Sequence, residues 1–192
     1  DALTLDVKFE GDVVYLLGLT KDETGGSEYF RLRGELDGVH AAPGEPSPYV
    51  GNRVPAVDAT QTLPLYRALE TANRERLVRS AATPGKGGLA LALARSAMAG
   101  ELGMELDLDL APDLAALPPD VALFSESNGR FVVTVAERDA AGLESIFRGL
   151  PCRRIGAVTA AKSLRVTLGG KRCINLDVAA MKSAYKETLA HV

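Results

Sequence analysis

Tryptophan is absent from this sequence, and its other aromatic residues are few, with five Tyr and five Phe among 192 residues. Proteins that bind single-stranded nucleic acid stack bases on aromatic side chains along a positively charged groove. The formal net charge here is −3, so the attraction to phosphate that dominates nucleic-acid binding is also missing. Composition and charge therefore argue against nucleic acid as a partner.

Histidine and cysteine are also scarce, with two of each. His40 and His191 have no neighbours at metal-ligand spacing, so we expect no metal site. Two such histidines cannot complete a Ser/His/acid or Cys/His set, and we predict no catalytic residue in this chain. Cys152 and Cys173 form no CxxC motif. They could form a disulfide, but we favour two free thiols in a cytoplasmic protein.

No apolar run approaches the ~20 residues that a membrane-spanning helix needs, so we expect no membrane partner. The sequence begins at Asp1 rather than Met. Our interpretation is that residues 1–192 form a single domain, cut from a larger multidomain enzyme. Residues 34–58 include four prolines, and we expect them to form a surface excursion of this domain rather than a linker.

Strand-like and helix-like patterns interleave along the chain. We predict strands over residues 3–9, 12–20, 77–81, 104–110, 130–135, 154–158, 164–168 and 172–176, with 154–158 and 164–168 forming a hairpin. We predict helices from about residue 27, over 60–76 and 88–98, in two short pieces at 113–117 and 120–124, and over 137–148 and 178–190. Asp58 and Asp177 are predicted N-caps, and Pro64 is expected in the first turn of its helix. This pattern favours an α+β fold, a mixed β-sheet with helices packed on it.

The first candidate site is the glycine-rich turn between a predicted strand and an Ala- and Leu-rich helix. Backbone N–H groups at such a helix start can bind phosphate, and Lys86 would add a positive charge. The turn is not a Walker A loop, because Ser80 stands at the first glycine position and Gly87 follows the lysine. Gly87 and Gly88 could instead allow the helix to pack closely on the sheet. We favour packing, with Lys86, Gly87 and Gly88 kept as phosphate-facing candidates.

The second candidate site is the polar segment that precedes the predicted strand 130–135. Glu126 could accept a hydrogen bond from a sugar hydroxyl, and Ser127 and Asn128 could bind polar ligand groups. Asn128 with Gly129 is equally good turn chemistry, and Ser125 is a good cap. The residues alone leave both interpretations open.

Two weaker candidates have simpler explanations. Residues 25–28, Gly-Gly-Ser-Glu, could form an anion-binding helix start, but we favour a structural cap. Glu105, Asp107 and Asp109 alternate along a predicted strand, and we interpret them as one solvated face rather than a metal site.

Four blocks, in this order, resemble a known family: residues 18–29, the Gly-Gly-Leu-Ala-Leu-Ala-Leu-Ala helix from Gly87, residues 123–135 and residues 150–158. They are similar to the C-terminal end of the phosphoribosylformylglycinamidine synthase family, in its synthetase subunit or large form. More broadly, they resemble the C-terminal domain of the aminoimidazole ribonucleotide synthetase superfamily. The resemblance covers nearly the whole chain, and its most specific part is the Leu-Phe-Ser-Glu-Ser sequence that begins at residue 123.

The resemblance implies a three-layer fold and a role in an ATP-dependent carbon–nitrogen ligase of purine biosynthesis. That enzyme converts formylglycinamide ribonucleotide and glutamine to formylglycinamidine ribonucleotide, and it is cytoplasmic. ATP and magnesium would be bound mainly by N-terminal nucleotide-binding domains, so no cofactor is expected on this domain alone. The implied partners are the preceding nucleotide-binding domain and a glutaminase subunit or domain. The isolated domain is expected to be inactive.

The family's substrate-binding Glu-Ser-Gln corresponds to Glu126, Ser127 and Asn128, with Asn replacing Gln. The family also carries an Asp ahead of its glycine turn that serves a metal, and here Thr83 stands at that position. A missing carboxylate is a missing ligand for a hard cation. The resemblance therefore indicates the second, non-catalytic repeat, with any remaining ligand contact at residues 126–128.

Two alternatives remain. One is a stand-alone phosphate-binding module built on Lys86 and the helix start at Gly87 and Gly88. The other is a different superfamily member, such as a hydrogenase-maturation or selenophosphate-type enzyme, which fits the fold but not the Leu-Phe-Ser-Glu-Ser sequence.

Overall fold

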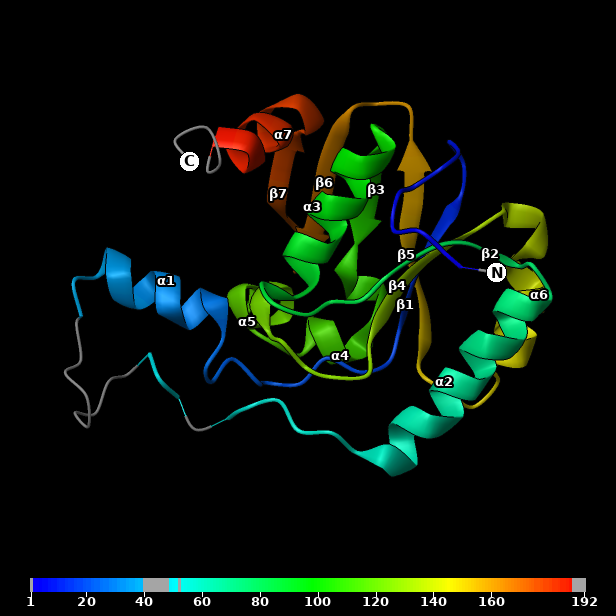
Figure 1. Ribbon diagram of the computed structural model, residues 1–192, viewed down its shortest axis with the longest axis horizontal. Helices are drawn as coiled ribbons and strands as arrows, with labels where there is room; N and C mark the ends of the chain where they lie inside the picture. The colour runs from blue at the N-terminus through cyan, green and yellow to red at the C-terminus, as the bar shows by residue number, and fades with distance from the viewer. Residues whose placement is uncertain (1, 40–48, 52, 188–192) are drawn as a thin grey trace.

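The computed structural model describes residues 2–39, 49–51 and 53–187. Its described strands form one seven-stranded sheet in the order β2-β4-β1-β5-β3-β6-β7 (Figure 1). The strands are β1 (Val13–Leu17), β2 (Val78–Ala82), β3 (Gly103–Asp107), β4 (Phe131–Val135), β5 (Cys152–Thr159), β6 (Ser163–Leu168) and β7 (Lys171–Asp177). Neighbouring strands pair antiparallel except β3 and β6, which pair parallel. The predicted mixed sheet is confirmed.

Two of the helices begin directly after the capping residues Asp58 and Asp177 that the sequence predicts. The helices are α1 (Glu28–Leu36), α2 (Ala59–Arg74), α3 (Gly88–Gly100), α4 (Pro112–Ala115), α5 (Pro119–Phe124), α6 (Ala140–Ile146) and α7 (Val178–Glu187), with 3-10 turns at Leu108–Leu110 and Glu137–Asp139. Asp58 accepts a hydrogen bond from the N–H of Thr60 at 3.0 Å, and Asp177 accepts one from Ala179 at 2.8 Å. Both predicted N-caps are confirmed. The last residues of the predicted 178–190 helix lie outside the described part of the chain.

The helices cover both faces of the sheet, as strand β1 shows most clearly. Val14 and Leu16 belong to a core cluster with helices α3, α4, α5 and α7, whereas Val13, Tyr15 and Leu17 belong to a second cluster with α2 and α6. Side chains alternate across a strand, so these two clusters lie on opposite faces. Figure 1 shows α3 and α7 over β6 and β7, with α2 and α6 at the other end of the sheet. The fold is the predicted three-layer α+β arrangement.

The predicted hairpin of residues 154–158 and 164–168 is wrong. Strand β3 lies between β5 and β6, pairing with both, and the true hairpin joins β6 to β7. The short β5–β6 connection passes over the first residue of β3, Gly103. A Cβ at Gly103 would overlap the carbonyl oxygen of Ala161. Local alternation predicted β5 and β6 correctly, but it carries no information about which other strand lies between these two.

The predicted strand over residues 3–9 is also wrong. This segment makes isolated hydrogen bonds, from Ala81 N–H to Thr4 O at 3.0 Å and from Val7 N–H to Ser96 O at 3.4 Å. Of its alternating apolar residues only Val7 is buried, and Phe9 is 55% exposed. The alternation therefore reflects contacts with β2 and α3 rather than strand pairing.

Smaller differences concern the ends of elements. The predicted strand 104–110 ends at Asp107 in a 3-10 turn, and the helix predicted over 137–148 begins with another. Pro64 lies in the second turn of α2 rather than the first. Within the predicted excursion 34–58, residues 34–36 belong to α1, and residues 40–48 and 52 lie outside the described part of the chain.

Candidate functional site

Two loops meet at one edge of the sheet. Because β1 and β4 are antiparallel neighbours, the end of β1 lies beside the start of β4, and so do the loops attached there. Ser127 Oγ accepts a hydrogen bond from Lys21 N–H at 3.0 Å, and Ser125 Oγ donates one to the Lys21 carbonyl at 2.7 Å. We call residues 18–24 and 125–129 the paired loops.

Glu126 links the paired loops to two helices. Its Oε1 accepts hydrogen bonds from the backbone N–H groups of Glu28 and Gly87, both at 2.9 Å. These N–H groups belong to the starts of α1 and α3, where the helix dipole favours negative charge. No described residue bonds to Oε2, and the side chain is partly exposed. Glu126 therefore already supplies the anion at the glycine turn and keeps one oxygen free.

The glycine turn is closely packed. A Cβ at Gly88 would lie 2.7 Å from the carbonyl oxygens of Leu123 and Ser125, so glycine is needed where α3 meets the end of α5. The Gly88 N–H donates to Gly85 O at 2.8 Å. Lys86 is exposed, with its ammonium 3.4 Å from a carboxylate oxygen of Glu28. The N–H groups of the two phosphate-facing candidates, Gly87 and Gly88, thus have acceptors within the protein.

The other two predicted ligand-facing residues differ in exposure. Ser127 is buried and bonded within the paired loops. Asn128 is exposed and lines a shallow pocket with Lys21, Asp58 and Gln61. The structure therefore places Asn128 and the free oxygen of Glu126 where a ligand could reach them, and Ser127 behind them.

Arg130 is a residue whose role in the site the sequence analysis missed. It precedes β4, is completely buried, and donates three hydrogen bonds: Nε to Ser127 O at 3.0 Å, Nη1 to Thr20 Oγ1 at 2.9 Å, and Nη2 to Ser125 O at 2.6 Å. These acceptors lie on both paired loops. The available signal was a lone cation directly before a mostly apolar strand.

Burial lowers the pKa of Arg130 to about 10, and the charges of Asp113, Glu23 and Glu126 act in the opposite direction. The guanidinium therefore remains positive at neutral pH. Each of these three carboxylates also accepts a backbone N–H: Asp113 from Thr20 at 2.7 Å, Glu23 from Ala56 at 3.3 Å, and Glu126 as described above. The site is thus built around one buried cation and three carboxylates that hold separate segments.

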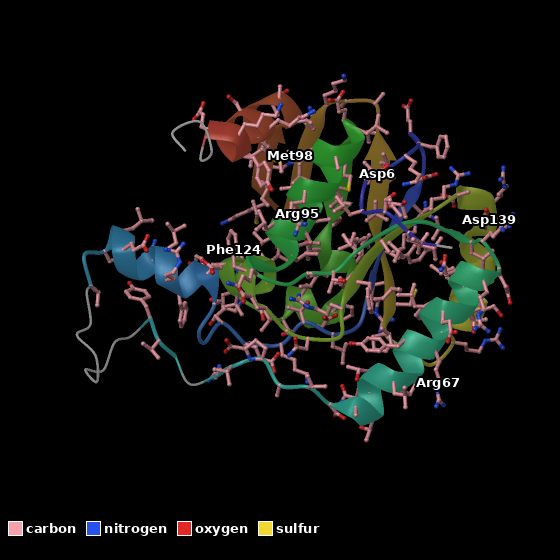
Figure 2. The ribbon with its side chains drawn as sticks, in the orientation of Figure 1. Asp6, Arg67, Arg95, Met98, Phe124 and Asp139 are labelled. Carbon is pink, nitrogen blue, oxygen red and sulfur yellow. The ribbon has the colours of Figure 1, made fainter. Side chains whose placement is uncertain are left out.

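Two contacts fix the N-terminal end of helix α1 beside this site. Ser27 Oγ accepts from the Phe30 N–H at 3.2 Å, which confirms the structural cap predicted for residues 25–28. Phe124, labelled in Figure 2 at the end of α5, stacks on Tyr29 with ring centroids 4.9 Å apart. These contacts orient the N-terminal end of α1 toward Glu126.

Glu105, in β3, and Asp109, in the 3-10 turn that follows it, make structural contacts. Glu105 pairs with Arg172 at 2.6 Å and with Arg165 at 3.7 Å. Asp109 accepts from the N–H groups of Gly169 and Gly170 at 2.8 and 3.0 Å, closing the β6–β7 turn. Glu105 and Asp109 are both exposed, as predicted for a solvated face, and they also make these contacts. Within residues 2–39, 49–51 and 53–187, no three His, Cys, Asp or Glu side chains are grouped as a metal site requires. His40 and His191 lie outside these ranges.

Both cysteines are free thiols, as the sequence analysis favoured. Burial raises the pKa of Cys152 to about 12, whereas Cys173 is exposed. The described helices include none long and apolar enough to cross a bilayer.

The fold and the paired loops define a mixed-sheet domain with helices on both faces, and comparison with known proteins assigns its family. Residues 10–169 match the family described as AIR synthase related protein, C-terminal domain. The chain belongs to this family.

Curated relatives are much longer than this chain. Phosphoribosylformylglycinamidine synthase subunit PurL of Thermococcus sibiricus is 32% identical over 182 residues, covering 95% of this chain and 23% of the relative. The same subunit of a Parafrankia species is 37% identical over 183 residues, covering 94% of this chain and 21% of the relative. The chain therefore spans less than a quarter of these relatives, and the predicted family resemblance is confirmed.

Solved structures support the same fold. Thermotoga maritima PurL complexed with FGAR superposes with a TM-score of 0.73 at 22% identity, covering 93% of this chain and 29% of that one. The hydrogenase maturation protein HypE of Escherichia coli superposes less well, with a TM-score of 0.56 at 18% identity over 92% of this chain and 52% of that one. At these identities the likeness is one of fold.

Proposed function

We propose that this chain is the C-terminal domain of a phosphoribosylformylglycinamidine synthase. In the full protein it would contribute to the ATP-dependent conversion of formylglycinamide ribonucleotide to formylglycinamidine ribonucleotide in purine biosynthesis, with glutamine as the amide donor. The observation that carries this proposal is the position of Glu126, which belongs to the Leu-Phe-Ser-Glu-Ser sequence. It is held by Glu28 and Gly87, with its second oxygen available to a ligand.

The proposed role of the domain is to form one wall of a ligand cleft that other domains complete. The carboxylate of Glu126 can accept hydrogen bonds from ribose hydroxyls, and the amide of Asn128 can both donate and accept. Glu126 is fixed by two N–H groups before a ligand arrives, which reduces the entropy lost on binding. The pocket beside Asn128 is shallow, so the rest of the cleft must come from another domain.

The glycine turn does not fit a bound ATP phosphate or magnesium ion. Its Gly87 and Gly88 N–H groups have internal acceptors, and Thr83 stands where the family has an Asp. We therefore assign ATP and magnesium to other domains of the parent enzyme. The partners we propose are the preceding nucleotide-binding domain of the same polypeptide and a glutaminase subunit or domain, in the cytoplasm.

Kinetics of the full-length protein test this proposal. Glu126→Ala and Asn128→Ala should each raise KM for formylglycinamide ribonucleotide by about tenfold, the equivalent of one lost hydrogen bond of ~1.4 kcal/mol. Glu137→Ala and Asn175→Ala are the matched controls, because both residues are exposed and lie away from the paired loops. Unchanged KM in both site variants would rule out residues 126–128 as a ligand contact.

The alternative, a stand-alone phosphate-binding module, makes a different prediction. It requires binding at Lys86, Gly87 and Gly88 without any further domain. Calorimetry of the 192-residue chain with ATP and with ribose 5-phosphate distinguishes the two. We expect no heat of binding at millimolar ligand. A saturable signal that Lys86→Ala abolishes would favour the module.

A further inference from the structure

We propose that Arg130 is a positioning residue that holds both paired loops in the arrangement through which the domain contacts its ligand. The inference rests on the proposed function for the ligand itself. The geometry of the loops stands independently of that function.

The guanidinium reaches both loops at once. Two of its acceptors, the carbonyl oxygens of Ser125 and Ser127, flank Glu126 on either side. Fixing these two carbonyls fixes the direction in which the Glu126 side chain leaves the backbone. The third acceptor, Thr20 Oγ1, lies on the other loop, next to Lys21. Arg130 therefore sets the position of one loop relative to the other.

Only arginine can make this connection. Its planar guanidinium presents N–H donors in several fixed directions, whereas the lysine ammonium is a compact charge on a flexible stem. Arg130 uses all three of its nitrogens, each toward a different acceptor. A lysine at this position would leave some of these acceptors without a hydrogen bond in the interior, where an unsatisfied polar group is costly.

The charge of Arg130 also supports the contacts around it. Asp113, Glu23 and Glu126 all act on the guanidinium, and Oε2 of Glu23 is buried without a partner among the described residues. Without the cation, these carboxylates would lose a positive charge in their neighbourhood. The N–H contacts that they make to Thr20, Ala56, Glu28 and Gly87 would weaken together.

The full-length protein with Arg130→Lys, and separately with Thr20→Val, tests the inference. Thr20→Val removes one of the three hydrogen bonds with little change of shape, so it remains informative if Arg130→Lys does not fold. Arg79→Lys is the control, because Arg79 is a partly buried arginine in an ion pair with Asp12 at 2.5 Å, away from the paired loops.

Two measurements are made on each variant: hydrogen exchange of the backbone, and KM and kcat for formylglycinamide ribonucleotide. We expect Arg130→Lys to accelerate exchange at Lys21, Glu126 and Gly87 by about tenfold or more, the effect of losing about one internal hydrogen bond. Exchange in β1 and β4 should stay unchanged. KM should rise by about tenfold with kcat within about twofold, because the lost positioning affects binding. Thr20→Val should show smaller changes of the same kind, and Arg79→Lys neither.

Unchanged exchange and KM in both site variants would overturn the inference. So would equal changes in Arg79→Lys, since these would reflect lost stability alone. Faster exchange in both loops with unchanged KM, together with unchanged KM in Glu126→Ala, would instead contradict the proposed function. The inference that Arg130 positions the loops would then remain supported, but the proposed function would not.

Discussion

Glu126 occupies, with its own carboxylate, the place that a phosphate could take at the start of α3. One oxygen satisfies the N–H groups of Glu28 and Gly87, so two helices from distant parts of the chain begin at the same anion. The glycine turn therefore binds a carboxylate of the protein itself, in the place where a phosphate could have bound.

Two substitutions at Glu126 should destabilise the chain to different extents. Glu126→Ala leaves both N–H groups without their acceptor and should lower the free energy of unfolding by about 2–3 kcal/mol. Glu126→Gln keeps an acceptor oxygen and loses only the charge at the helix starts, which costs about 0.3–1 kcal/mol. Urea unfolding at pH 7 measures both. Equal losses would show that the two hydrogen bonds contribute nothing beyond the charge.

The two thiols should differ in reactivity. Burial raises the pKa of Cys152 to about 12, and only the thiolate attacks a disulfide reagent. At pH 8 we expect one fast reaction with such a reagent, at the exposed Cys173, and a much slower one at Cys152. Cys173→Ala should abolish the fast phase. A fast phase that survives in this variant would contradict the burial of Cys152.

The same shift predicts a loss of stability in alkali. The folded-state pKa of Cys152 is raised above its ordinary value of 9.0, so the unfolded chain loses its proton first as pH rises. Stability should therefore fall from about pH 9 to about pH 12, by up to about 1.4 kcal/mol per pH unit. Urea unfolding across this range should show a shallower fall in Cys152→Ala than in Cys173→Ala. Identical slopes would contradict the assignment.

At the scale of elements, the connection from β5 to β6 passes over the first residue of β3, and β3 lies between these two strands. Gly103 is the residue that permits it, because a Cβ there would overlap the Ala161 carbonyl. We expect Gly103→Ala to lower the free energy of unfolding by at least about 3 kcal/mol. Gly85→Ala is the control, since Gly85 has open space around its Cβ position, and it should change stability by less than about 1 kcal/mol. Similar effects of the two substitutions would contradict this crossing.

Most elements could be predicted because their determinants are local. The apolar runs of β1 and β4 and the caps at Asp58 and Asp177 depend on residues within a few positions of one another. Strand order does not: the β5–β6 hairpin was a reasonable local prediction, and it failed because β3, some fifty residues earlier in the chain, lies between the two strands. Residues 3–9 failed for the same reason, since their alternation arises from contacts with β2 and α3.

The site was predictable in part. The position of Glu126 and Asn128 before a strong strand drew attention to them, and the resemblance to a family strengthened that interest. The contact of Glu126 with Glu28 and Gly87 spans 98 and 39 residues of sequence, so no local pattern could reveal it. Arg130 was missed because a single arginine beside a turn usually lies at the surface.

At the scale of the whole molecule, the chain has the fold that we propose to form one wall of a ligand cleft. Among the described residues, helices cover both sheet faces and Arg130 forms a buried charge network with its neighbours, while Asn128 is exposed and Glu126 partly exposed. The chain spans less than a quarter of its relatives' length. Both features agree with a domain that forms one wall of a cleft and depends on the remaining protein for catalysis.

The most direct test of this account is turnover measured with the 192-residue chain and, in parallel, with a full-length synthase polypeptide that carries this chain as its C-terminal domain. Both are assayed for formylglycinamidine ribonucleotide after addition of formylglycinamide ribonucleotide, ATP, magnesium and an amide donor. We predict product from the full polypeptide and none from the chain alone. Product formed by the chain alone would contradict the account, and so would a full polypeptide that forms none.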